Sequence, residues 1–145
     1  MCACLVPLCH IRQALCWALL LLPIELGWEA AQLPLYTSWQ SKSAATLIHD
    51  LVHCTVGDAM IAFASYLAAS LLLAAPKWPK TARIRGTLLT TALGTAYTVA
   101  SEWYHLRVGD WTYADAMPRV AGIGVSPLLQ WLLLPVIVVF LCRAR

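Results

Sequence analysis

The sequence predicts an all-α fold: an integral membrane four-helix bundle with both termini in the cytoplasm. The first observation is composition, because 61% of the 145 residues are hydrophobic, only 12% are charged and the mean hydropathy is +0.71. A soluble domain is about 45–50% apolar and about 25% charged. The second is that the apolar residues gather in four segments, and the third is that basic residues flank these segments unevenly. At this length, residues 1–145 form a single membrane domain.

Four apolar segments are each close to the length of a membrane-spanning helix, which requires about 20 residues. The predicted spans cover about 11–33, 46–74, 86–105 and 125–142. Pro23 is expected to kink the first span, and Pro76 and Pro79 end the second. The third span is rich in Thr, Ser, Ala and Gly, which favour close helix packing in lipid, so we expect it to be buried among the others.

Basic residues indicate which ends of the spans face the cytoplasm. The most basic connection, 75–86, contains no acidic residue and holds Lys77, Lys80, Arg83 and Arg85. Arg12 precedes the first span, and Arg143 and Arg145 follow the last. The other connections, 34–45 and 106–124, have one base and a balanced set of charges. Because basic flanks mark the cytoplasmic side, both termini are predicted inside, and 106–124 lies on the bilayer surface or folds over the bundle.

Ionisable residues gather in the outer halves of the first three spans, where burial in lipid costs about 2.5–3.5 kcal/mol for a charged group near the bilayer centre. The predicted ligand-binding residues are Glu29, His53, Asp58 and Glu102. The predicted supporting residues are Glu25, His49, Asp50, His105, Tyr36 and Trp103. Since the spans are antiparallel, these segments meet at one end. The sequence therefore predicts a periplasm-facing polar pocket between the first three helices, with 106–124 near its mouth.

Three interpretations of this pocket remain open. The first is a divalent transition metal held by His53, Asp58 and Glu102. It is suggested by Glu102 and His105, which form a Glu-x-x-His pair of the kind that binds metals in helical bundles. The second is a polar network that holds the helices together. The third is a pathway for protons or a small substrate. If the protein is an enzyme, a metal-activated water or a carboxylate general base is the natural mechanism.

These interpretations lead to two hypotheses about function. In the first, the pocket binds a metal or a small ligand. In the second, the chain is a non-catalytic accessory or assembly subunit of a membrane complex, and its polar network is structural. The lipid bilayer is the expected environment, and a membrane-protein partner or a second copy of the chain remains open. Nucleic-acid binding is not expected, because the net charge of +3 is small and the bases are not interleaved with aromatic residues.

Three short motifs carry a resemblance to other proteins. They are Val-His-Cys-Thr-Val-Gly-Asp at 52–58, Ser-Glu-Trp at 101–103 and Trp-Thr-Tyr-Ala-Asp-Ala-Met-Pro at 111–118. With the residues around them, over about 27–131, they resemble an uncharacterised group of small bacterial four-helix inner-membrane proteins. The resemblance implies a multi-pass protein of the bacterial inner membrane and implies no activity. It favours the four predicted ligand-binding residues over His49 and His105.

Overall fold

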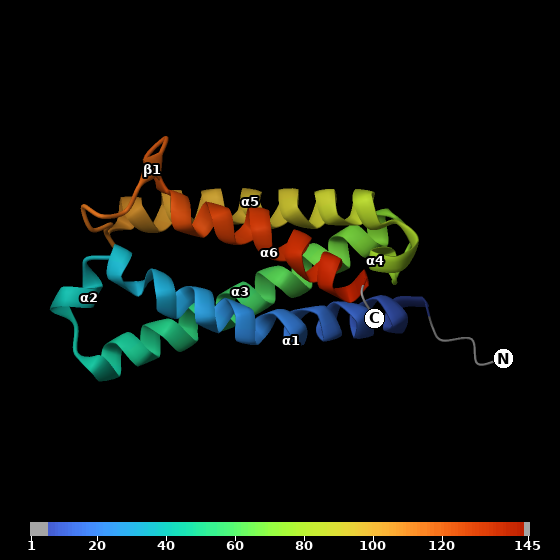
Figure 1. Cartoon of the computed structure of the whole chain (residues 1–145), viewed down its shortest axis with the longest axis horizontal. Coiled ribbons are helices and arrows are strands. Elements are labelled where there is room, and N and C mark those ends of the chain that lie inside the picture. The colour runs from blue at the N-terminus through green and yellow to red at the C-terminus, as the bar shows by residue number, and fades with distance from the viewer. Residues whose placement is uncertain (1–5, 144–145) are drawn as a thin grey trace.

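The computed structural model describes residues 6–143, and most of them are helical (Figure 1). The four long helices are α1 (Val6–Gln32), α3 (Ala44–Leu72), α5 (Arg83–Val108) and α6 (Val125–Arg143). The short elements are the 3-10 turn η1 (Leu33–Leu35), α2 (Ser38–Ser41), α4 (Trp78–Thr81) and the strands β1 (Arg119–Val120) and β2 (Ile123–Gly124), which pair antiparallel. The all-α prediction is confirmed, and each predicted apolar segment coincides with one long helix.

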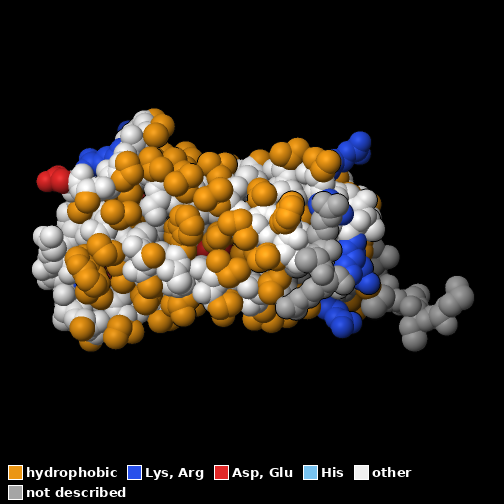
Figure 2. All heavy atoms as spheres, viewed as in Figure 1, with side chains coloured by type: hydrophobic (Ala, Val, Ile, Leu, Met, Phe, Trp, Pro, Cys, Tyr) orange, Lys and Arg blue, Asp and Glu red, His pale blue; other side chains and the backbone are white. Residues whose placement is uncertain are grey.

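Two of the helical segments in the described part of the chain are long and apolar enough to cross a membrane. They are Pro7–Leu35 and Ala44–Leu72, and Val125–Leu141 is an apolar helix of shorter length. Apolar side chains cover most of the visible middle of the molecule, and Lys and Arg side chains gather mainly at one end (Figure 2). The apolar surface agrees with the high apolar content of the sequence.

The long helices pack as two pairs that α3 joins. Helix α1 packs mainly against α3, and α5 packs against both α6 and α3. The start of α1, the turn α4 and the end of α6 lie at one end of the molecule, while α2 and the β1–β2 hairpin lie at the other (Figure 1). We call these the basic end and the hairpin end. The basic end carries the 75–86 connection, which was predicted to share a side with both termini.

Close contacts between glycine and tryptophan set the spacing of the helices. A Cβ atom placed on Gly86 would lie 2.1 Å from Cε3 of Trp78, and one placed on Gly94 would lie 2.1 Å from Cε3 of Trp131. Only glycine allows α5 to approach these rings so closely. The small residues of the third predicted span thus form one packed face, with Gly94 buried against α6. The span was expected to be buried among the others, and this is wrong, because Ile84, Leu88 and Tyr97 on its other faces are exposed.

The connection between α5 and α6 folds over the hairpin end of the bundle, which was one of its two predicted positions. Gly109, at φ +80°, ends α5 and turns the chain. The backbone then pairs with the connection between α1 and α3, because the Thr37 amide donates to the Thr112 carbonyl at 3.0 Å. The side chains of Tyr113 and Met117 are buried beneath this segment. The fold thus brings 109–124 next to the polar ends of α1, α3 and α5.

Candidate functional site

A cleft of about 500 Å³ opens at the hairpin end of the bundle, with walls from α1, α3, α5 and α6. All four predicted ligand-binding residues line it: Glu29, His53, Asp58 and Glu102. We call this space the acidic cleft. The prediction placed the pocket between the first three helices, and α6 is an additional wall that the prediction missed.

Gln130 of α6 forms the floor of the acidic cleft and joins three helices. Its Nε2 atom donates to Oε2 of Glu25 on α1 at 2.5 Å and to Oδ2 of Asp58 on α3 at 2.9 Å. Gln130 and Glu25 are only 2% and 1% exposed. Glu25 therefore lies below the floor rather than in the cleft wall. The signal that identifies Gln130 in the sequence is a single amide within an otherwise apolar segment.

The α1 wall carries a second hydrogen-bonded chain. Gln32 Nε2 donates to Oε1 of Glu29 at 2.5 Å, and the hydroxyl of Ser126 on α6 donates to Oε1 of Gln32 at 2.8 Å. The Glu29 carboxyl group also interacts with Asp58 across the cleft. Positions 25, 29 and 32 recur on one helix face, and all three side chains are buried, so this polar face of α1 points into the bundle.

The third wall carries Glu102 of α5, which the hairpin connection covers. The Tyr113 hydroxyl donates to Oε2 of Glu102 and accepts a hydrogen bond from the Gly124 amide at 2.8 Å. Trp111 Nε1 also points to Oε2 of Glu102, at 3.4 Å. Burial, and then the bond to Glu102, raise the pKa of Tyr113, so the phenol keeps its proton at neutral pH. This connection was predicted to lie near the mouth, but Trp111 and Tyr113 were not predicted as partners of Glu102.

Charged and imidazole side chains surround the mouth of the cleft. Lys42 Nζ pairs with Oδ2 of Asp50 at 2.6 Å, and His49 Nδ1 lies 3.5 Å from Oδ1 of the same residue. The rings of His49 and His53 are nearly parallel, with centroids 6.2 Å apart. Four of the predicted supporting residues, Tyr36, His49, Asp50 and His105, line the cleft. The mouth is thus the part of the site where positive charge is present.

The predicted metal site is not supported. Across residues 6–143, no group of three or more His, Cys, Asp or Glu side chains is positioned to hold a metal ion. His105 Nδ1 bonds to Oδ2 of Asp110 at 2.5 Å, whereas Glu102 is held by Tyr113 and Trp111, so the Glu-x-x-His pair does not converge on one point. His53 belongs to the mouth and Asp58 to the floor.

The predicted supporting role of Trp103 is also wrong. Its ring is 53% exposed and lies outside the cleft, with the Arg107 guanidinium 4.0 Å from the ring centroid. It follows Glu102 directly on a helix, and adjacent helical residues point about 100° apart. A supporting role in the cleft therefore does not fit Trp103.

The carboxyl groups inside the cleft lack basic partners. In the described part of the chain, the ion pairs within 4.0 Å join Asp50 or Asp110 to Lys42, His49 or His105, all at the mouth. None involves the deeper carboxyl groups of Glu25, Glu29, Asp58 or Glu102. In addition, Oε1 of Glu25 is buried with no hydrogen-bond partner in this structure. A buried acceptor of this kind calls for a proton or a donor from outside the chain.

No family model matches the chain, and no match was found among curated proteins or solved structures. A function for this fold must accordingly be argued from the chemistry of the acidic cleft.

Proposed function

We propose that the chain is a multi-pass protein of the bacterial inner membrane whose acidic cleft opens to the periplasm and binds a small ligand with positive charge or several hydrogen-bond donors. Helices α1 and α3 are long and apolar enough to cross, and α5 and α6 run beside them (Figure 1). The 26 residues of α5 extend about 39 Å and the 19 of α6 about 28 Å, against a hydrocarbon core of about 30 Å. The bacterial location rests on the resemblance of the three motifs.

The position of the charges supports the orientation. Basic residues of the 75–86 connection lie at the same end as the start of α1 and the end of α6 (Figure 2). Because positively charged flanks stay in the cytoplasm, the basic end faces inward and the hairpin end faces outward. The mouth of the acidic cleft then opens to the periplasm.

The observation that carries the binding proposal is the uncompensated acidity of an open cleft. Glu29, Asp58 and Glu102 reach one space from three helices, and their only charged neighbours in the described part of the chain are other acids or groups at the mouth. Carboxyl groups are acceptors when ionised, so they select ligands that donate. Burying a charged group is costly unless it is paired, and a cationic ligand supplies the pair.

An accessory or assembly subunit is the second candidate, favoured by the way Gln130 bonds to both α1 and α3. Buried polar networks of this kind hold helices together in lipid. The open volume of about 500 Å³ favours binding instead, because a network that serves only packing leaves no room for a ligand. The two candidates differ in what an isosteric change at Asp58 should do.

A ligand screen on purified protein tests the proposal. The melting temperature in mild detergent is measured with small amines, polyols and organic anions, for wild type and for Asp58→Asn. Binding predicts that amines or polyols raise the melting temperature, that anions do not, and that Asp58→Asn removes the rise while folding normally. Asp115→Asn, an exposed acid outside the cleft, is the matched control and should keep the rise. A large loss of stability in Asp58→Asn, with no stabilising compound in any class, would favour the accessory subunit.

Reporter fusions test the orientation independently. Alkaline phosphatase is active only in the periplasm, so fusions after Ala116 should be active and fusions after Thr81 inactive. The opposite pattern would place the cleft on the cytoplasmic side and contradict the proposed location.

A further inference from the structure

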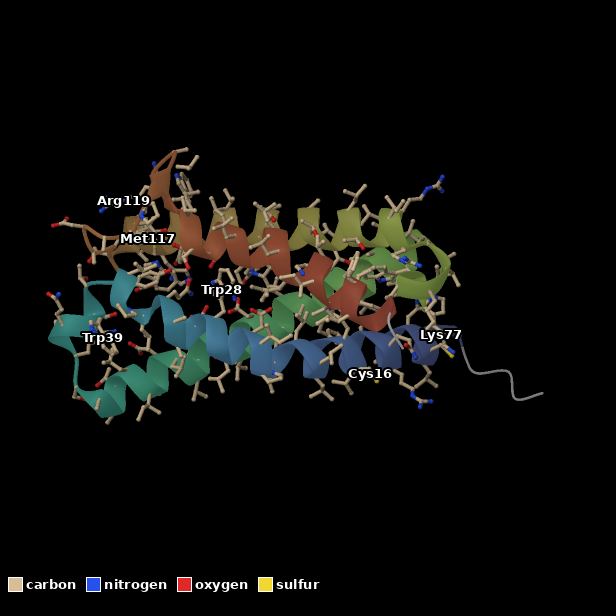
Figure 3. The ribbon with its side chains drawn as sticks, viewed as in Figure 1. Cys16, Trp28, Trp39, Lys77, Met117 and Arg119 are labelled. Carbon is tan, nitrogen blue, oxygen red and sulfur yellow. The ribbon has the colours of Figure 1, made fainter. Side chains whose placement is uncertain are left out.

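The polar interior also comes to the surface on the side of the bundle, away from the mouth of the cleft (Figure 2). Halfway along the molecule, an acidic side chain is visible between apolar side chains, over the boundary between α1 and α6 (Figure 2). Helix α1 packs mainly against α3 and α6 mainly against α5, so this boundary is sparsely packed. Trp28 extends from α1 into the space between the two helices (Figure 3). We call this boundary the lateral seam.

Polar contacts hold the lateral seam together. Glu25 and Gln32 of α1 bond to Gln130 and Ser126 of α6, and these hydrogen bonds belong to the network around the cleft. Trp28 Nε1 is buried without a hydrogen-bond partner in this structure, as is Oε1 of Glu25 three residues earlier on the same helix. The seam therefore combines an apolar outer surface with unpaired polar atoms behind it.

The position of the seam determines which molecules can reach it. In the proposed orientation it faces lipid, because apolar side chains surround it (Figure 2). Glu25 lies seven residues before the end of α1 at Gln32, about 10 Å below the outer surface. A free cation in water reaches the cleft by the mouth and gains nothing from the seam. A molecule with an apolar chain already lies in the outer leaflet, with its polar group near the surface.

We propose that the ligand of the acidic cleft is a single-chain amphiphile with an amine headgroup, which enters through the lateral seam. This inference rests on the proposed binding function. The headgroup lies between Glu29 and Asp58 in the cleft, with the unpaired Oε1 of Glu25 behind the floor, and the chain stays in the bilayer beside α1 and α6. A primary ammonium group carries three N–H donors and one positive charge, which matches these acceptors and their lack of a basic partner. The ring of Trp131, which lines the cleft, adds an aromatic face for the cation.

A matched series of amphiphiles tests the inference with full-length protein in phosphatidylcholine nanodiscs. The probes are methylamine, octylamine and dodecylamine, with octanol and octyl sulfate as headgroup controls, and the readout is the melting temperature. Subtracting the response of Asp58→Asn removes effects of the probe on the bilayer itself. We expect the amine concentration for half of the maximal shift to fall at least about tenfold from methylamine to octylamine, because the chain concentrates the headgroup at the seam.

The possible outcomes distinguish a failure of lateral entry, or of the amine headgroup, from a failure of ligand binding itself. An Asp58-dependent shift that is equal for methylamine and dodecylamine overturns lateral entry and leaves a water-borne cation as the ligand. A shift with octanol as large as that with octylamine overturns the amine headgroup. If neither this series nor the polyols of the wider screen gives a shift that depends on Asp58, the binding function itself fails. Glu29→Gln provides a second neutral variant if Asp58→Asn does not fold, and Asp115→Asn should behave as wild type throughout.

Discussion

The two halves of the bundle are built from the same four helices but differ in packing. In the basic half, the rings of Trp17, Tyr66 and Trp78 pack together with centroids 5.1–5.5 Å apart, and Gly86 lies directly against one of them. In the hairpin half, the helices diverge around an open cleft lined by carboxyl groups. Dense packing at one end and an unfilled polar space at the other thus occur within single helices, since α1, α3 and α5 contribute to both.

The difference teaches where stability and function reside. Close packing of small and aromatic side chains favours helix association, and the basic end holds the cluster of three aromatic rings. A cavity and a group of like charges oppose folding, and such groups persist where they serve a ligand. Changes in the basic half should therefore act on stability, and isosteric changes in the hairpin half should act on binding.

The largest effect is expected for Trp78→Ala. The ring is 0% exposed and contacts both Trp17 and Tyr66, so its removal leaves a cavity that the rigid helices cannot fill. A loss of about 3–5 kcal/mol in the free energy of unfolding is expected, measured by circular dichroism in denaturant. Trp103→Ala removes an exposed tryptophan and should cost far less. Equal losses for the two variants would mean that the basic half is not the main source of stability.

Overpacking the same region should come next. Gly86→Ala places a Cβ atom 2.1 Å from the Trp78 ring, so the helix or the ring must move, at a cost of about 3 kcal/mol. Gly27→Ala is the matched control, because no atom lies within 4 Å of the added Cβ. That variant should gain up to about 1 kcal/mol from helix propensity. The comparison of the two halves breaks down if Gly86→Ala is as stable as Gly27→Ala.

Tyr113→Phe should have a smaller and more local effect. It leaves the Gly124 amide without its acceptor and removes the hydroxyl donor from Glu102, which costs about 2 kcal/mol. Hydrogen exchange at Gly124 should speed up, whereas Tyr104→Phe, an exposed tyrosine, should leave that exchange unchanged. Because burial raises the pKa of Tyr113 above its ordinary value of 10.0, the wild-type bond contributes fully below pH 10 and is lost as the pH rises further. Exchange at Gly124 that is insensitive to the Phe substitution would show that the hairpin does not depend on this phenol.

The positions of the long helices were predictable because each apolar segment is about 20 residues long, so a few misassigned residues at its ends do not change where it lies. The predicted helix ends were less accurate. Helix α5 begins at Arg83 and ends at Val108, beyond the predicted 86–105. The predicted span was limited by its apolar residues, whereas the backbone stays helical through the charged residues Arg83 and Arg107. The convergence of Glu29, Asp58 and Glu102 was predictable, because antiparallel neighbours bring the outer ends of the first three segments together.

The rest of the site depends on side-chain partners that spacing does not reveal. Gln130 and Tyr113 carry no charge at neutral pH, and nothing in their spacing marks them as site residues, although they bond to Asp58 and Glu102. The Glu-x-x-His spacing suggested a metal, and the structure instead directs His105 to Asp110. Which of two nearby acceptors a side chain chooses is decided by the connection that folds over it, and periodicity along one helix contains no record of that.

The smallest effect on stability is expected at the mouth of the cleft. Lys42→Met breaks the ion pair with Asp50, but the two side chains are 38% and 31% exposed, so the loss should be at most about 1 kcal/mol. The same change removes a positive charge from the entrance and frees the Asp50 carboxylate. A cationic probe should then bind about twofold more tightly at low salt, and added salt should cancel the gain because exposed charges are screened. Lys80→Met at the basic end is the control and should change neither quantity. If Lys42→Met weakened the binding of cations, the mouth would act as a structural support of the cleft, and the division between a stabilising half and a binding half would have to be redrawn.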